Sequence, residues 1–555
     1  MRLTGLVSTR TGHGTRRAGR GRLLAAAAAL AAAASAGGMI AGVPAASASS
    51  SETVIVTSSG PLSPVSAVLD VLGTVLAQFQ IINGVEASIP AVLEPVLAAL
   101  PGITVTPDVS VSVESAVEST GPHTPSDEFL QQTGATRLAA AGDTGQGVTV
   151  AVIDTGIDNL PDFAGRLIGG VDLTGGNSPF QDNYGHGTFV AGLIAGDGAS
   201  SGGAYSGEAP GAALVSIKVA GASGTTDLVR LILGLQWAVA NRVADNIRVL
   251  NMSLGFQPFE STDLNPLDQA VEAAWNAGIA VVTSAGNAGP SNGTILSPGD
   301  DPLAITVGAL DDLAQPAVAD DEMTNFSSAG PTSPDGWAKP DLVTSGRSVV
   351  SLAAPGSTVY HQNPSARVGS ANFVGSGTSF SSAITSGAAA LVLAANPGLT
   401  PDELKARLLA TAGPGPVGNP FVDGHGALNA YAAATAGPMN LSQSTFGLLP
   451  ALPGVTVSLS PAGSPADSWN AGLWSGVSWP QASSGGPAWG GTAWNGTAWN
   501  GFAWTSRAWN DGGWQGAAWN GQAWDGSAWD GSAWAGSAWN GAAWSSGAWD
   551  ASEWN

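Results

Sequence analysis

Three glycine-flanked stretches of the sequence carry the residue types of nucleophilic catalysis. Asp154 follows the apolar run 148–153 and precedes a glycine turn, and His186 stands between two glycines where a helix is expected to begin. Ser379 lies at the front of a long apolar segment with helical character. Taken singly, each has an ordinary explanation, as a turn cap, a surface or core histidine and a helix N-cap. Three such coincidences in one chain are improbable, so the pattern predicts a joint site.

The chemistry explains why these three residue types would be needed together. A serine hydroxyl is a weak nucleophile at neutral pH and must lose its proton as it attacks a carbonyl carbon. A histidine with a pKa near 6.5 can accept that proton and later return it to a leaving group. A carboxylate fixes the histidine tautomer and stabilises the imidazolium ion. Asp154, His186 and Ser379 are therefore the candidate catalytic residues.

The stretches "GVTVAVIDTGID", "NYGHGTFVAGLIAG" and "GSGTSFSSAITSGAAALVLAANP" resemble the subtilisin-like serine proteases (subtilases), whose catalytic residues occur in this chain order. The resemblance covers roughly residues 125–436. It implies a serine endopeptidase that hydrolyses peptide bonds through an acyl-enzyme, with Ser379 as nucleophile, His186 as general base and acid, and Asp154 as its orienting carboxylate. The sequence departs from the family at Phe189, commonly a second histidine, and at Ala383, commonly a proline. Neither position carries a proton in the mechanism.

The resemblance also implies residues that stabilise the reaction and bind the substrate. Asn287 in "AVVTSAGNAGP" matches the oxyanion asparagine of the family, with the backbone N–H of Ser379 as second donor. An extended substrate would pair with one strand and face an opposing loop at 220–224. The floor of the primary specificity pocket would be small and apolar. The implied substrate-binding residues are Ser253, Leu254, Gly255, Gly221, Ala285 and Gly286.

No cofactor is expected to be required for the chemistry. The absence of cysteine excludes thiol nucleophiles, disulfides and cysteine-bound zinc, and no H-E-x-x-H motif of a metalloprotease is present. Structural calcium is common in subtilases, so it is possible here. Asp182, Asp300 and Asp301 lie in turn-rich stretches, but their spacing specifies no site, and the metal ligands stay unknown.

The elements that must position these residues alternate between strands and helices. Short β-branched runs are interleaved with helical segments such as 226–243 and 266–278. This alternation predicts an α/β fold with a doubly wound, mostly parallel sheet. The predicted strands are 148–154, 213–219, 247–253, 279–284 and 304–309.

The first 48 residues have the pattern of a signal peptide. They carry six arginines and no acidic residue, followed by an apolar alanine-rich run and the small-residue site Ala46-Ser47-Ala48. The alternative is a retained membrane anchor. Beyond residue 48 the chain has 12 basic against 41 acidic residues, which makes it a poor nucleic-acid partner. We expect a secreted, extracellular or cell-surface protein, monomeric, that acts on protein or peptide substrates.

Residues 49–120 are predicted to form a small ferredoxin-like α+β domain. The pattern is strand, helix, strand, helix, strand, with helices expected over 65–79 and 89–102. The segment resembles the inhibitory propeptide of secreted subtilases, which would be removed after about residue 120. An independent binding domain has the same pattern. The catalytic domain would then span residues 121–436.

The C-terminal part of the chain repeats in fives. A proline-, glycine- and serine-rich linker is predicted over 437–467, and in the tail, 468–555, seventeen of the eighteen fifth positions from 469 to 554 are tryptophan. A period of five gives no stripe on a helix and alternates faces on a strand. The tail is therefore either a solenoid with one side per pentad or a disordered low-complexity segment. Its aromatic rings suggest a cell-wall polymer as partner. The alternative function is a surface-binding or polymer-binding protein whose protease domain serves mainly self-processing.

Overall fold

The computed structural model describes residues 51–113 apart from 61, 63–68 and 70–72, residues 125–437 apart from 177, and two-residue strands between 498 and 554. The predicted signal peptide, residues 438–467 of the linker and the rest of the tail lie outside the described residues. The chain divides into two compact units, Met1–Asp108 and Val109–Asn555.

The first unit holds a four-stranded antiparallel sheet. Its strand order is β2-β3-β1-β4, which is the order of a ferredoxin-like sheet. A short helix, α3 (Glu94–Ala98), precedes the last strand. Aliphatic side chains on alternate strand positions form the core, among them Val54, Val56 and Val85. The strands are β1 (Ser51–Ser58), β2 (Thr74–Phe79), β3 (Gly84–Pro90) and β4 (Ile103–Pro107).

The structure shortens both helices predicted for this unit, and most of residues 65–72 lies outside the described residues. Residues 74–79, predicted as the end of a helix, form strand β2, in which side-chain burial alternates and ends at the buried Phe79. The spacing of apolar residues in 74–79 is compatible with a helix or a strand, and hydrogen bonding to β3 stabilises the strand. The helix predicted over 89–102 contracts to α3 because β3 continues to Pro90 and pairs there with Ser51.

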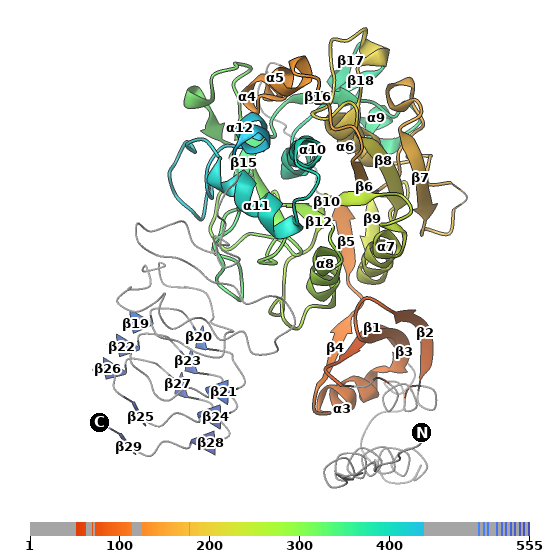
Figure 1. The fold of residues 1–555 in the computed structure, drawn as a ribbon. Helices are drawn as coiled ribbons and strands as arrows, with labels where there is room; N and C mark the ends of the chain where they lie inside the picture. Colours follow the sequence, from red (N-terminus) through yellow and green to blue (C-terminus); the bar gives the residue numbers. More distant parts are fainter. Residues whose placement is uncertain are drawn as a thin grey trace, which may run out of the picture. The chain divides into compact units, whose positions relative to one another are not determined.

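The second unit is built on a mostly parallel sheet with helices on both faces, as predicted. The strand order is β14-β13-β12-β10-β6-β8-β7, with β15 beside β13, and only the β13–β14 pair is antiparallel (Figure 1). The strands are β6 (Thr149–Asp154), β7 (Leu167–Asp172), β8 (Ala213–Lys218), β10 (Ile247–Met252), β12 (Ala280–Ser284), β13 (Ile305–Asp311), β14 (Glu322–Met323) and β15 (Leu342–Ser345).

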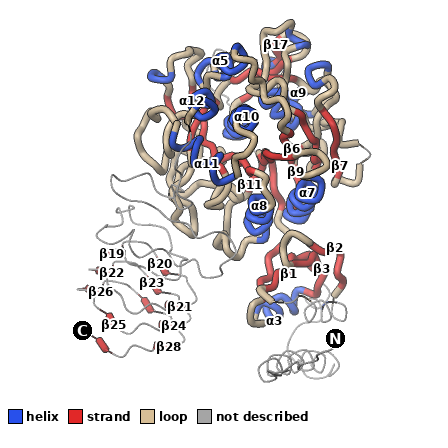
Figure 2. The backbone as a smooth tube through the Cα atoms, in the orientation of Figure 1, coloured by secondary structure: helices blue, strands red, loops and turns tan. Residues whose placement is uncertain are grey.

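The longest helix of the described residues, α10 (Thr378–Ala395), forms the centre of this unit. It packs against the sheet and against α6, and α7 and α8 pack against each other (Figures 1 and 2). Although α10 is long and apolar enough to cross a membrane, 89% of it is buried inside the fold. The other helices are α4 (Phe129–Gln132), α5 (Ala135–Ala140), α6 (His186–Ala195), α7 (Leu228–Asn241), α8 (Pro266–Asn276), α9 (Thr358–Gln362), α11 (Pro401–Ala410) and α12 (Ala430–Thr435).

Two small three-stranded sheets complete the second unit. One is antiparallel and places β18 (Asn372–Gly375) between β16 (Val349–Leu352) and β17 (Arg367–Val368). The other places β5 (Ser110–Val113) between β11 (Leu254–Gly255) and β9 (Thr225–Asp227), with both pairings antiparallel. A segment from the N-terminal part of the chain therefore lies in extended form beside the stretch predicted to bind substrate.

The two-residue strands of the tail pair in parallel at a spacing of twenty residues. Twenty residues are four pentads. A solenoid with one pentad on each of four sides has this offset between successive coils. The paired strands form four ladders. They are β19 (Ala498–Trp499), β22 (Ala518–Trp519) and β26 (Ala538–Trp539); β20 (Ala503–Trp504), β23 (Ala523–Trp524) and β27 (Ala543–Trp544); β21 (Ala508–Trp509), β24 (Ala528–Trp529) and β28 (Ala548–Trp549); and β25 (Ala533–Trp534) and β29 (Glu553–Trp554).

Glu208 is a buried acid at the junction of α6 and α10. Its N–H donates to the carbonyl oxygen of Leu193 in α6 at 2.8 Å. A Cβ atom added to Gly387 of α10 would lie 2.5 Å from Cβ of Glu208, so the acid packs directly on that helix. Burial raises the pKa of Glu208 from 4.5 to about 8, opposed by the hydroxyl of Thr133.

This raised pKa predicts a pH-dependent stability. The folded state favours the protonated acid, so the contribution is fully present below about pH 4.5 and is lost as the pH rises through about 8. Thermal unfolding of Glu208→Gln should therefore show a smaller decrease in apparent Tm between pH 5 and pH 9 than the parent, both carrying Ser379→Ala to prevent autolysis. The exposed Glu322→Gln is the control. Equal pH dependence in parent and Glu208→Gln would contradict this account.

Candidate active site

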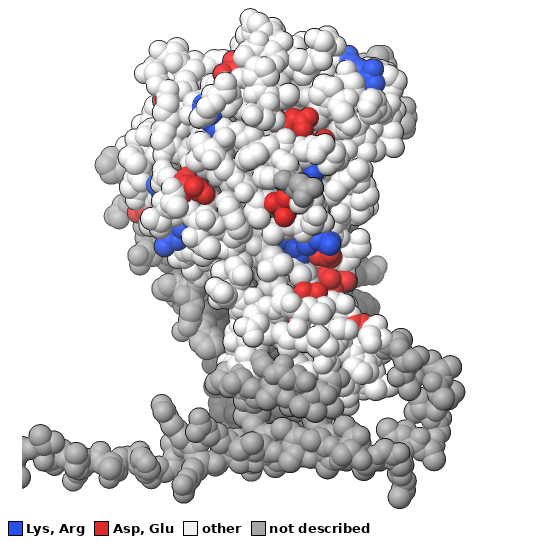
Figure 3. Space-filling view, turned by 90° about the vertical axis from the view of Figure 1, so that its right-hand side faces the viewer, with Lys and Arg blue, Asp and Glu red and all other residues white. Residues whose placement is uncertain are grey.

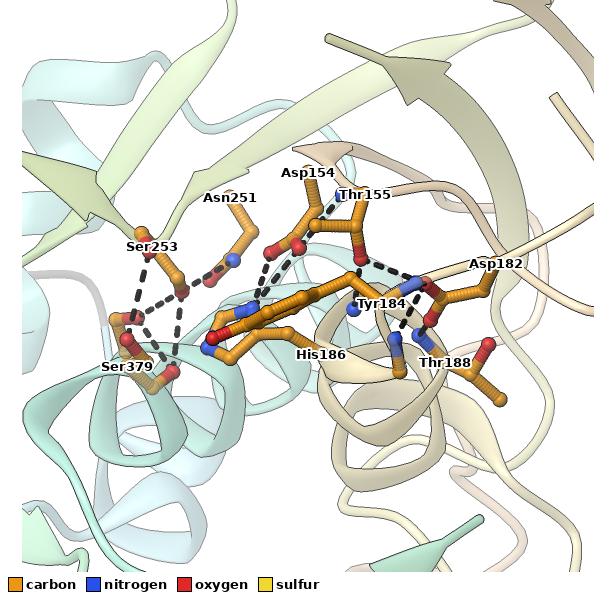
Figure 4. Close-up of polar contacts among 12 residues, drawn as sticks. Asp154, Thr155, Asp182, Tyr184, His186, Thr188, Asn251, Ser253 and Ser379 are labelled. Carbon is orange, nitrogen blue, oxygen red and sulfur yellow. Dashed lines mark hydrogen bonds and ion pairs between the residues drawn. The ribbon is translucent and has the colours of Figure 1, made fainter. Parts of the chain in front are cut away.

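The structure brings Asp154, His186 and Ser379 together at one edge of the sheet. Nδ1 of His186 lies 2.8 Å from Oδ1 and 2.9 Å from Oδ2 of Asp154. The three residues are buried, with exposed fractions of 1%, 4% and 0%. Figure 4 shows the imidazole ring between Asp154 and Ser379. A carboxylate, an imidazole and a hydroxyl are thus arranged in the order that proton transfer requires.

The elements explain why residues so distant in sequence meet. Asp154 ends β6, His186 begins α6, and Ser379 is the second residue of α10. In an open parallel sheet the carboxyl ends of the strands form the crevice where ligands bind. Helix α6 approaches β6 closely because its second residue is Gly187, where an added Cβ would lie 2.2 Å from the carbonyl oxygen of Gly156.

Asp182 holds the loop in front of the histidine, a role that the sequence did not reveal. Its Oδ1 accepts hydrogen bonds from the hydroxyl of Thr155 at 2.8 Å and from N–H of Gly185 at 2.7 Å, and its Oδ2 accepts from N–H of Thr188 at 2.8 Å (Figure 4). Burial raises the pKa of Asp182, and these donors oppose the rise. The available signal was an acid placed before the glycine turn "NYGHG".

Asn287 is oriented by Thr378, the residue before the serine. Oδ1 of Asn287 accepts from the N–H of Thr378 at 2.9 Å and from its hydroxyl at 3.1 Å. The hydroxyl of Thr378 also accepts from N–H of Gly286 at 3.1 Å. With Oδ1 engaged in this way, Nδ2 is the donor group that Asn287 presents. Thr378 was not singled out in the sequence because a threonine at a helix start is ordinary.

Ser253 supports the serine loop through its side chain. Its hydroxyl donates to the carbonyl oxygen of Ser379 at 3.1 Å and accepts from Nδ2 of Asn251 at 2.9 Å (Figure 4). Its own carbonyl oxygen lies 3.4 Å from Oγ of Ser379. The next two residues, Leu254 and Gly255, form β11 and pair with β5. The hydroxyl of Ser253 thus faces the first turn of α10.

Gly221, predicted to face the substrate, lies in a turn. N–H of Gly224 donates to the carbonyl oxygen of Gly221 at 3.0 Å, which closes this turn. An extended segment follows: the carbonyl oxygen of Gly224 accepts from N–H of Val113 at 3.0 Å, and the β9 strand (Thr225–Asp227) then pairs with β5. Gly221 thus lies in the turn and outside the β5–β9 ladder.

Ala285 and Gly286 are buried, and the space beside Gly286 is filled by Leu296. A Cβ added to Gly286, whose φ is +108°, would lie 2.7 Å from Cγ of Leu296, and one added to Gly255 would lie 3.0 Å from Cβ of Leu296. Leu296 therefore packs beside both predicted substrate-binding glycines. Nothing in its sequence context marked it, because the contact depends on the folding of the loop after β12.

The described residues contain no cluster of three or more His, Asp or Glu side chains that could hold a metal ion. Asp300 and Asp301 are buried together, and burial raises the pKa of Asp301 to about 6, with Lys339 and Lys405 opposing the rise. The predicted structural calcium therefore has no assigned ligands and stays a prediction.

Charged side chains are sparse on the face drawn in Figure 3. Small groups of Lys or Arg and of Asp or Glu are separated by broad uncharged areas, and no extended basic patch is seen. This face agrees with a chain in which only 11% of residues are charged.

Comparison with known proteins identifies the class. The model of the subtilase family matches residues 145–447. The chain is 44% identical over 292 residues to serine protease AprX of Bacillus subtilis (strain 168), covering 52% of this chain and 66% of AprX. It is 36% identical over 309 residues to subtilisin of Bacillus pumilus, covering 55% of this chain and 97% of that protein. The chain therefore belongs to the subtilase family and is a subtilisin-like serine protease.

A solved structure agrees at the level of the fold. Fervidolysin from Fervidobacterium pennivorans superimposes with a TM-score of 0.56 at 22% identity, covering 71% of this chain and 62% of fervidolysin. The mostly parallel sheet with flanking helices is thus the fold of a known subtilisin relative.

The bonds between Thr378 and Asn287 predict a kinetic effect. Thr378→Val removes one of the two donors to Oδ1 of Asn287, so the carboxamide should lose its fixed orientation. We expect kcat for a peptide amide to fall about tenfold with KM little changed, less than the 100- to 1000-fold cost measured in this family for losing the asparagine itself. Thr385→Val is the matched control, because its hydroxyl is also buried in α10 and has no hydrogen-bond partner. Equal kcat losses in the two variants would count against the role of Thr378.

Proposed function

We propose that the protein is a secreted serine endopeptidase with Ser379 as nucleophile, His186 as general base and acid, and Asp154 as the carboxylate that orients His186. The observation that carries this proposal is the buried pair of short contacts between Nδ1 of His186 and Asp154, formed beside the first turn of α10. Secretion is supported by the signal-peptide pattern of residues 1–48.

The reaction follows from these positions. Oγ of Ser379 attacks the carbonyl carbon of the scissile bond as His186 takes the hydroxyl proton. The oxyanion of the tetrahedral intermediate accepts hydrogen bonds from Nδ2 of Asn287 and from N–H of Ser379. His186 then gives its proton to the departing amine, which leaves an acyl-enzyme. A water molecule, activated by the same imidazole, hydrolyses this ester and releases the acid product.

Strand β5 supports a proposal for how the substrate binds. It lies between β11 and β9 and pairs with both, which is the arrangement expected of an extended peptide added to two edges. Val111 and Val113 are 1% and 7% exposed, whereas Ser110 and Ser112 are exposed. We therefore propose that the substrate-binding cleft accepts apolar side chains at alternate positions of the bound strand.

The same strand supports the proposal that the residues before the catalytic domain act as an inhibitory propeptide. As long as Ser110–Val113 occupies the space between β11 and β9, no other peptide can pair there. Val113 pairs with Leu254, the residue after Ser253, and the carbonyl oxygen of Ser253 is 3.4 Å from Oγ of Ser379. Self-cleavage is therefore expected a short way beyond Val113, consistent with the boundary at about residue 120 that the sequence predicts.

The test uses the full chain with and without Ser379→Ala. The parent should yield a mature form whose N-terminus, read by mass spectrometry, lies near residue 121, and that form should cleave added casein. Ser379→Ala should remain a full-length precursor without activity on casein. Casein cleavage by the variant would disprove the nucleophile. A parent that processes itself but leaves casein intact would favour a protease domain that serves mainly self-processing.

The tryptophan tail is a further part of the proposal. The twenty-residue register of its ladders brings tryptophan positions into line, for instance 499, 519 and 539. Repeated aromatic positions at one interval suit an extended polymer with a repeating unit, so cell-wall glycan stays the predicted partner of the tail.

A further inference from the structure

The imidazole of His186 packs against the ring of Phe380, which in turn packs against the ring of Phe189. The ring of Phe380 has its centroid 5.7 Å from that of His186, with an angle of 33° between the planes. Phe189 lies against the same phenylalanine at 4.4 Å and 42°. All three side chains are buried. Such tilted contacts at these separations are favourable aromatic geometries.

The two phenylalanines are next to the catalytic residues along the chain as well as in space. Phe380 directly follows Ser379 in α10, and Phe189 lies one turn after His186 in α6. The contact between Phe189 and Phe380 therefore joins the two helices at the level of the catalytic residues. Phe189 occupies one of the positions where the sequence departs from the family pattern.

The surroundings leave the rings little freedom to move. An added Cβ on Gly375 of β18 would lie 2.6 Å from Cε2 of Phe380 and 3.1 Å from Cζ of Phe189, so both rings reach the backbone of that strand. The carbonyl oxygen of Phe189 accepts a hydrogen bond from the hydroxyl of Ser351 in β16 at 2.7 Å. Glycine at 375 is thus required by the space that the rings occupy.

We propose that Phe380, braced by Phe189, is a positioning residue that holds the imidazole of His186 at the orientation needed for both of its proton transfers. Asp154 contacts the imidazole at one ring edge, at Nδ1, whereas Phe380 packs against the ring itself and restricts its tilt. The inference rests on the proposed roles of Ser379 and His186.

The proposal predicts different effects on the hydrolysis of amide and ester substrates. Hydrolysis of an amide needs His186 twice in acylation, first to take the proton of Ser379 and then to protonate the departing amine. A p-nitrophenyl ester of the same acyl group has a leaving group that departs without protonation. A tilted imidazole should therefore slow amide hydrolysis more than ester hydrolysis, whereas a general loss of folded enzyme would lower both rates equally.

The experiment compares Phe380→Leu and Phe189→Leu with the parent, each as the mature enzyme from the full chain. Active sites are counted by titration so that kcat refers to competent enzyme. We expect kcat for the amide to fall by about tenfold or more in Phe380→Leu, with KM within twofold and a smaller fall for the ester. Phe189→Leu, which removes only the brace, should show a smaller change of the same kind and keeps the test valid if Phe380→Leu fails to fold.

Phe163→Leu is the matched control, because it removes a fully buried ring elsewhere in the same unit. It should lower the apparent Tm and leave kcat per active site unchanged on both substrates. Unchanged amide kcat in both test variants, or equal losses on amide and ester, would overturn the positioning role and leave the assignment of Ser379 intact. Loss of the Ser379 assignment itself would appear in the Ser379→Ala experiment.

Discussion

The active site depends on one short contact in a buried place, between Nδ1 of His186 and the carboxylate of Asp154. With Nδ1 engaged by the carboxylate, the proposed mechanism assigns the proton exchange with the serine to Nε2. The contact can form only if the end of β6 and the start of α6 approach closely, which Gly187 allows. Asp182 secures the same approach by joining the loop before His186 to Thr155, the neighbour of Asp154. The surrounding fold therefore holds the end of β6 and the start of α6 in fixed positions relative to each other.

The serine side of the site is organised in a similar way by polar groups around α10. Thr378 fixes the carboxamide of Asn287, and the hydroxyl of Ser253 bonds to the carbonyl oxygen of Ser379. Because α10 is buried along nearly its whole length, these few contacts set the position of its first turn against the sheet. The aromatic pair links this turn to α6. The proposed nucleophile, base and oxyanion donor thus share one rigid frame, which is the condition for preorganised catalysis.

The candidate catalytic residues and much of the main sheet could be proposed from sequence because their signals are local. Asp154, His186 and Ser379 each lie beside a glycine-marked turn, and β6, β8, β10, β12 and β13 are short runs rich in β-branched residues between helical segments. The features that the sequence did not predict depend on tertiary contacts. Residues 74–79 become a strand because β3 pairs with them, and the extended segment that pairs with β5 begins after the turn at Gly221. Leu296 and Thr378 act through contacts between segments that are distant in sequence, which no local pattern encodes. The period of five residues is visible in the sequence, whereas the twenty-residue offset between paired strands is known only from the strand pairing in the structure.

The most direct test of the central claim is covalent labelling of the mature enzyme with an organophosphonate, followed by peptide mapping. The reagent modifies a serine whose hydroxyl is activated by a neighbouring base. We predict that Ser379 is the single modified residue. Its labelling rate should fall almost to zero in His186→Ala and fall strongly in Asp154→Asn. Labelling of a different serine, or labelling of Ser379 at an unchanged rate in both variants, would contradict the account.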